Sequence, residues 1–177
     1  MIEKRNFRRK SEIWPYERKH YFHNLKIKAI QQRGPTCVAH CLAMMTGTDP
    51  QYFIDLMQRE LIDIQDPRTW SDALKPFAMK LAFVPSDIRK MKHYMNDLVA
   101  KDDMFALCYY SSTDPDDLLT EPDGDGWLTG SHIVLLHRDI IYDSKTGMAM
   151  GALDHECCEK HTKRIFRVVP LEEERGL

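Results

Sequence analysis

The sequence predicts an α+β fold, with a helical first half and an antiparallel sheet in the second half. Between residues 36 and 100 the apolar residues recur mainly at helical spacing, and capping residues and prolines interrupt them. From residue 104 onward the apolar residues form short runs separated by turn residues, which is typical of strands. With 177 residues, of which 43% are hydrophobic, the chain is long enough for one sizeable core.

The first half is expected to contain helices with two brief strands between them. Thr36 can cap a helix that Gly47 ends, and Asp49-Pro50 places a cap and a proline at the start of the next helix. Ser86 can cap a third amphipathic segment. The expected helices span residues 36–46, 50–61, 69–78 and 86–100, and the expected strands span 25–30 and 81–85.

The second half is expected to form the sheet. The expected strands span residues 104–110, 131–137, 140–143, 148–153 and 164–169. If Arg138-Asp139 is a two-residue turn, His137 pairs with Ile140, and the numbers of paired residues sum to 277. The segment 111–130 is a long acidic loop, and loops of that length inside compact domains are commonly functional or disordered.

The charge distribution separates a basic extension, residues 1–28, from a single domain, residues 29–177. The extension carries nine Lys and Arg against three Glu, a net charge of +6, whereas the remainder carries −8. The extension also contains aromatic residues, among them Phe7 and Trp14. One interpretation of this combination is contact with nucleic acid. The more ordinary interpretation is a solvated segment that packs these aromatic residues on the domain.

Composition also restricts the class of protein. No apolar run approaches the length of a membrane span, and no apolar signal core follows the basic N-terminus, so we expect a cytoplasmic protein without membrane association. Five cysteines are an odd number, which favours free thiols over a disulfide framework.

Cys37 is the candidate nucleophile. It follows the Gly34-Pro35 turn and falls in the first turn of the predicted helix, where free backbone N–H groups and the helix dipole favour a thiolate. Gln31 lies six residues upstream, and its amide, together with the Cys37 N–H, can stabilise an oxyanion. Gln32 is the alternative, but the spacing favours Gln31.

His132 is the candidate base, since it begins a strand directly after the long loop, where a side chain can face a cleft. The hairpin register makes Asp143 its diagonal neighbour on the same face and the candidate for orienting the ring, with Asp154 as the rival. His137 has the opposite parity and is expected to face solvent. Trp127, in the loop, is expected to line the substrate cleft.

These segments resemble the papain-like cysteine peptidase superfamily. Gln31, the turn and the run Cys37-Val38-Ala39-His40-Cys41-Leu42-Ala43-Met44-Met45 are similar to the nucleophile helix of the bacteriocin leader-peptide (double-glycine) peptidase branch, with Val38 where that branch commonly has Gly. The second part of the resemblance is Ser131-His132-Ile133-Val134-Leu135 and the segment 141–147.

The resemblance implies a papain-like fold, in which the helical half carrying the nucleophile helix packs on the antiparallel sheet. It implies a cysteine peptidase that needs no cofactor, uses a Cys-His-Asp triad and acts on a peptide or protein. The same fold serves deamidases, transglutaminases and inactive binding modules, so these alternatives stay open.

A second cluster of potential ligands lies near the C-terminus. His155, Cys157, Cys158 and His161 suggest a metal site, but their spacing is not a usual zinc pattern, and adjacent cysteines rarely bind one ion. We therefore predict no metal site there.

Overall fold

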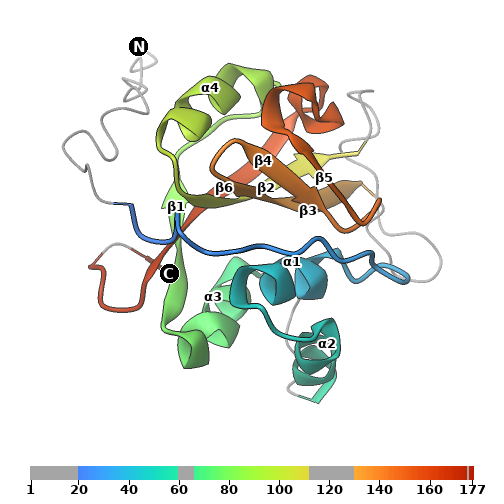
Figure 1. Cartoon of the computed structure of the whole chain (residues 1–177), viewed down its shortest axis with the longest axis vertical. Coiled ribbons are helices and arrows are strands. Elements are labelled where there is room, and N and C mark those ends of the chain that lie inside the picture. Colours follow the sequence, from blue (N-terminus) through green and yellow to red (C-terminus); the bar gives the residue numbers. More distant parts are fainter. Residues whose placement is uncertain (1–19, 60–65, 112–129, 175) are drawn as a thin grey trace, which may run out of the picture.

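The computed structural model describes residues 20–59, 66–111, 130–174 and 176–177. Its centre is a six-stranded antiparallel sheet in the order β1-β6-β2-β3-β4-β5, with helices on both faces (Figure 1). This arrangement agrees with the predicted α+β class. Within the described part of the chain, no helix has the length and apolar character needed to span a lipid bilayer.

The elements follow the order expected from the sequence. The helices are α1 Cys37–Thr46, α2 Pro50–Arg59, α3 Pro67–Leu74 and α4 Lys92–Ala100, with short 3-10 turns at η2 Lys75–Phe77, η4 Ala152–Asp154 and η5 Glu156–Glu159. The strands are β1 Met79–Val84, β2 Met104–Tyr110, β3 Ser131–His137, β4 Ile140–Asp143, β5 Met148–Gly151 and β6 Thr162–Pro170.

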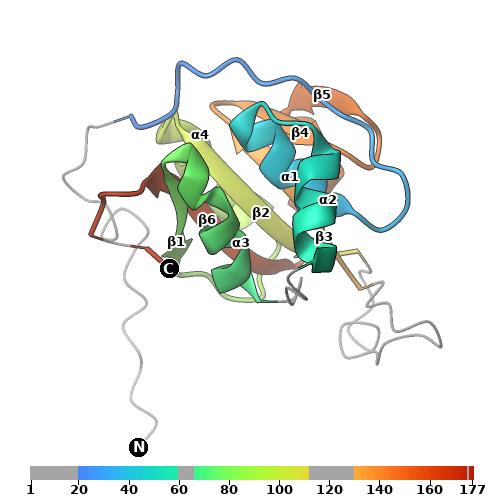
Figure 2. The same cartoon turned by 90° about the horizontal axis from the view of Figure 1, so that it is seen from below.

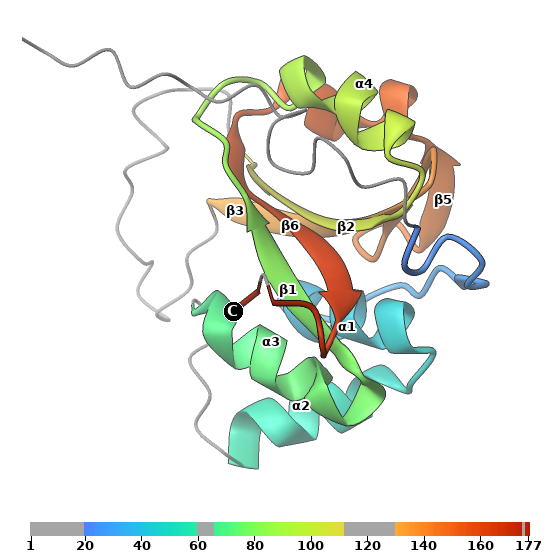
Figure 3. The ribbon, with the colours of Figure 1, turned by 90° about the vertical axis from the view of Figure 1, so that its left-hand side faces the viewer.

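The sheet separates two apolar cores, and strand β2 contributes to both. Met104, Ala106 and Cys108 belong to the core under α1 and α3, whereas Phe105 and Leu107 belong to the core under α4. This alternation follows from the two-residue period of a strand whose two faces are both covered. Figure 3 shows α1, α2 and α3 on one side of the sheet and α4 on the other, and Figure 2 looks onto the side that carries α1, α2 and α3.

Helix α1 lies against the middle of the sheet. Its residues 39–45 are all buried, and Gly47 ends it in the left-handed conformation with φ 68°. The expected cap by Thr36 is wrong, because its hydroxyl makes no capping hydrogen bond and instead donates to the Arg33 carbonyl.

Strands β1, β5 and β6 differ from their expected bounds by one or two residues at an end, and three larger differences have a visible cause. Residues 25–30 form no strand, and Ile27 and Ile30 pack against the core under α1 instead. Helix α3 begins early because Asp66 caps it, accepting a hydrogen bond from the Arg68 N–H. Helix α4 begins six residues later than expected, at Lys92, because Lys90 forms a β-bridge with His161.

The predicted β3–β4 hairpin register is confirmed. Leu135 pairs with Tyr142, Leu136 with Ile141 and His137 with Ile140. Arg138 adopts a positive φ of 60° in the two-residue turn, as such tight hairpins require. This register brings the end of β4, where Asp143 lies, close to the start of β3, where His132 lies.

A buried ion pair ties the N-terminal segment to the sheet. Arg167 donates to Asp103 at 2.7 Å, and both side chains are at most 1% exposed. The same carboxylate accepts hydrogen bonds from the backbone N–H groups of Tyr21 and Phe22. The part of the expected extension from residue 20 onward is thus held on the domain, while residues 1–19 lie outside the described residues.

We predict that Asp103→Asn lowers the free energy of unfolding by about 3–5 kcal/mol, because it leaves the buried Arg167 cation without its counter-charge. Urea unfolding measures the loss. The matched control is Lys75→Ala, which breaks an ion pair of the same 2.7 Å length whose side chains are 53% and 63% exposed, and we expect it to cost less than about 1 kcal/mol. Equal losses in the two variants would contradict the importance of burial.

Candidate active site

Cys37 is the first residue of α1 and the one half-buried cysteine; the other four, Cys41, Cys108, Cys157 and Cys158, are buried. The first N–H groups of a helix have no intrahelical partner, so the α1 terminus presents donors and a positive dipole end beside the Cys37 sulfur. Burial raises the pKa of the Cys108 thiol to about 12 and raises that of the Cys41 thiol well above its ordinary value. These two buried thiols therefore stay protonated.

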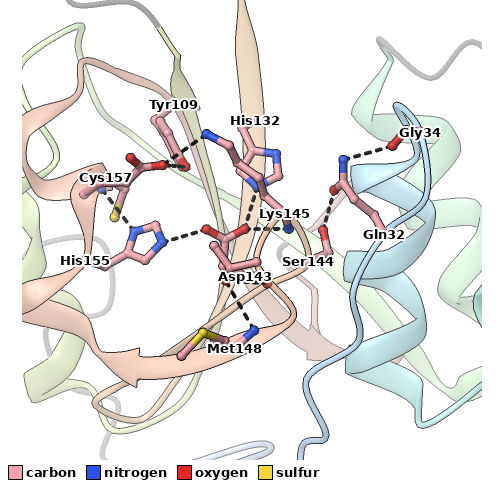
Figure 4. A network of polar contacts seen from close by, with 12 residues as sticks. Gln32, Gly34, Tyr109, His132, Asp143, Ser144, Lys145, Met148, His155 and Cys157 are labelled. Atoms are coloured by element: carbon pink, nitrogen blue, oxygen red, sulfur yellow. Dashed lines mark hydrogen bonds and ion pairs between the residues drawn. The ribbon is translucent and has the colours of Figure 1, made fainter.

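His132 and Asp143 form a buried hydrogen-bonded pair at the end of the β3–β4 hairpin (Figure 4). His132 Nε2 lies 2.8 Å from Asp143 Oδ1, and the two side chains are only 9% and 3% exposed. Asp143 Oδ1 also accepts a hydrogen bond from the Lys145 N–H at 2.9 Å. Since Nε2 faces the carboxylate, Nδ1 is the ring nitrogen left for the thiol.

The charge state of His132 follows from its neighbours. Burial by itself would lower the pKa of His132, but hydrogen bonds with Asp143 and Cys37, and the negative charges of both, outweigh this effect and raise the pKa to about 9. The ring therefore carries a proton at neutral pH, and an imidazolium is the counter-charge that a thiolate needs.

Asp143 remains an anion for a related reason. Burial would raise the pKa of the Asp143 carboxyl, but the hydrogen bonds from His132 and His155 and the Lys145 N–H hold it well below its ordinary value. His155 Nε2 lies 2.8 Å from Asp143 Oδ2, so each carboxylate oxygen faces a different imidazole. The site is thus a carboxylate between two histidines.

Gln32, rather than Gln31, faces the site. The Gln32 N–H donates to the Ser144 carbonyl at 2.7 Å, directly after Asp143, and the Ser144 hydroxyl donates to Gln32 Oε1 at 2.6 Å. Because a carbonyl only accepts, the 3.0 Å contact with the Gly34 carbonyl identifies the other amide atom as Nε2, which keeps a second N–H. Gln31 is exposed and packs against Gly147.

A cleft of about 210 Å³ opens beside His132. Its lining residues come from the segment before α1, both ends of the long loop and the turns after β4 and β5, and are Gln32, Tyr109, Ser111, Ser131, His132, Lys145, Glu156 and Lys160. The Tyr109 ring stands edge-on to both histidines, at 5.7 Å from His132 and 6.3 Å from His155. Burial and the nearby charges of Asp143 and Glu156 raise the pKa of Tyr109, so its hydroxyl stays neutral.

The remaining predicted residues lie elsewhere. Trp127 falls outside the described residues, so its expected place in the cleft is not described. Asp154, the rival of Asp143, is exposed in η4. His137 does not face solvent as expected: it is 6% exposed and its Nε2 lies 2.9 Å from the Phe22 carbonyl, because the N-terminal segment covers it.

Sequence reasoning missed the role of His155, which it grouped with a possible metal cluster. In the structure its two ring nitrogens face Asp143 and the Cys157 N–H, while the Cys158 thiol donates to the Ala152 carbonyl. Among the described residues no group of three or more His, Cys, Asp or Glu could hold a metal ion. No local motif marks His155, since its approach to Asp143 depends on the turns η4 and η5.

Comparison of the chain with protein-family models gives no match, and comparison with curated proteins gives none either. The function must therefore be argued from the chemistry of the site. The site combines a half-buried thiol at a helix N-terminus, a protonated histidine and a buried carboxylate.

We predict that iodoacetamide at pH 7 labels Cys37 faster than any other cysteine in the folded protein, by at least about tenfold, since the other four are buried and thiolates are the reactive form. Per-cysteine mass spectrometry measures the rates. His132→Ala should slow the labelling of Cys37, while labelling after unfolding in urea should become uniform. Labelling of Cys37 that ignores His132 would contradict the proposed pairing.

The His132 pair also predicts how stability depends on pH. The pKa is raised in the folded protein from 6.5 to about 9, so the stabilisation is complete below pH 6.5 and is lost as the pH rises through about 9. Between pH 7 and pH 10 the free energy of unfolding of the wild type should fall by about 1–3 kcal/mol more than that of His132→Gln. Parallel curves for the two proteins in urea would contradict the shift.

Proposed function

We propose that the protein is a papain-like cysteine peptidase that hydrolyses a peptide or related amide bond. The observation that supports this best is the hydrogen-bonded pair of His132 and Asp143, buried beside a cysteine at the N-terminus of a helix. Nucleophile, base and orienting group are the three roles that thiol-dependent acyl transfer requires. The packing of α1 on an antiparallel sheet supports the same family.

In the proposed first step, the Cys37 thiolate attacks the carbonyl carbon of the substrate and forms a C–S bond. The carbonyl oxygen takes up the negative charge, and the Cys37 N–H and the second N–H of Gln32 Nε2 stabilise it. Ser144 and the Gly34 carbonyl hold the Gln32 amide in place, so its orientation is fixed before substrate arrives.

In the second step, the His132 imidazolium gives its proton to the leaving nitrogen, the C–N bond breaks and a thioester remains. His132 then takes a proton from a water molecule, whose oxygen attacks the thioester. The C–S bond breaks, releasing the carboxylic acid and restoring the thiolate and the imidazolium. Asp143 stays ionised throughout, because it orients the ring and stabilises its positive charge.

A pool of fluorogenic peptidyl-coumarin amides tests the activity. We expect the wild type to release coumarin and Cys37→Ser to release none, since a serine hydroxyl paired with this imidazolium is a poor nucleophile. If Cys37 is labelled fast by iodoacetamide but no peptide is cleaved, a deamidase or transferase replaces the peptidase. If Cys37 is not labelled either, the protein is a binding module.

The neighbouring glutamines give a matched test of the oxyanion site. We predict that Gln32→Ala lowers kcat/KM by about 10²–10³-fold, because it removes a donor to the developing charge. Gln31→Ala, one residue away and facing Gly147, should stay within about twofold of the wild type. Rates from the same coumarin amides decide, and a larger loss in Gln31→Ala would overturn our assignment of Gln32.

A further inference from the structure

His155 is a buried histidine that the proposed reaction does not use. It is 5% exposed and lies between the turns η4 and η5, twelve residues after Asp143. Its Nε2 lies 2.8 Å from Asp143 Oδ2, and its Nδ1 lies 3.1 Å from the Cys157 backbone nitrogen (Figure 4). Both ring nitrogens are therefore committed to hydrogen bonds inside the protein.

These two contacts fix the tautomer of the ring. A backbone N–H can only donate, so Nδ1 of His155 must be the unprotonated, accepting nitrogen. The ring proton is then on Nε2, which donates it to Asp143 Oδ2. The Cys157 N–H therefore favours the tautomer in which His155 accepts at Nδ1 and donates at Nε2.

The donors to Asp143 are divided between its two oxygens. Oδ1 accepts from His132 Nε2 and from the Lys145 N–H, whereas the hydrogen bonds of the described residues give Oδ2 a single donor, His155. Without His155, a buried carboxylate oxygen would be left unsatisfied, and the carboxylate would gain by rotating or by taking up a proton. Either change weakens its contact with His132.

We propose that His155 is a positioning residue, which holds the Asp143 carboxylate ionised and turned so that Oδ1 faces His132. Its consequence for catalysis rests on the proposed function, but the positioning itself does not. Because His155 acts through Asp143 and lies on its far side from His132, it contributes no proton to the substrate.

Backbone hydrogen bonds on both sides of His155 fix its position between η4 and η5. The His155 N–H donates to the Ala152 carbonyl, and the His155 carbonyl accepts from the Cys158 N–H. The Cys158 thiol also donates a hydrogen bond to the Ala152 carbonyl. The titratable groups that interact with the Asp143 or His132 charge are Cys37, Cys41, Tyr109, His155 and Cys157, and the Lys145–Glu156 ion pair lines the cleft beside them.

The test is an NMR titration of His132 in three proteins, using long-range ¹H–¹⁵N correlation of the imidazole nitrogens. In the wild type the midpoint is expected at about pH 9. His155→Leu should lower this midpoint by about one unit, because the counter-charge opposite His132 is weakened. His155→Gln, whose side-chain amide can donate to Oδ2 in place of Nε2–H, should restore most of the wild-type value.

A purely structural role for His155 would change stability without moving the His132 midpoint, so an unchanged midpoint in folded His155→Leu would overturn the proposal. If that variant does not fold, the wild-type spectrum at pH 7 decides: an Nε2 of His155 that carries no proton could not donate to Asp143 and would overturn the proposal equally. The titration needs no substrate. A wild type that cleaves no peptide would therefore remove the proposed function and leave the assignment of His155 to be judged by its own data.

Discussion

The carboxylate of Asp143 is the group on which the site depends. A buried anion is costly unless it is hydrogen-bonded, and here donors reach it from three places in the chain: β3, the turn after β4, and the segment between η4 and η5. These donors stabilise the charge and at the same time fix the three segments relative to one another. The hydrogen bond between this carboxylate and His132 is, in turn, the largest of the effects that raise the pKa of His132, followed by the contact with Cys37.

Cys37 approaches His132 from the helical layer. Residues 20–32 run from the His137 end of β3 to the turn after β4. Near the start of this segment, Phe22 makes hydrogen bonds with Asp103 and His137. At its end, Gln32 makes hydrogen bonds with Ser144. The chain then turns at Gly34, whose φ of 69° suits glycine, and enters α1 at Cys37. The open end of the β3–β4 hairpin therefore positions both Asp143 and Gln32.

What could be predicted from sequence was what local rules determine. Cys37 stands at the start of a helix with a clear stop signal, and the placement of Asp143 near His132 follows from a two-residue turn and strand periodicity. Spacing alone favours Gln31 over Gln32, but the backbone contact of Gln32 with Ser144 places the Gln32 side chain at the cleft. His137 and His155 depend on contacts with segments 115 and 12 residues away, which no local pattern encodes.

The two histidines at Asp143 have the same side chain but different surroundings. Each presents Nε2 to one carboxylate oxygen at 2.8 Å, so the difference between them arises at Nδ1. For His132 that nitrogen is left for Cys37. For His155 it accepts a hydrogen bond from the Cys157 N–H. The contact at Nδ1 therefore separates the two rings: His132 has a nitrogen left for the thiol, whereas both nitrogens of His155 are occupied by hydrogen bonds inside the protein.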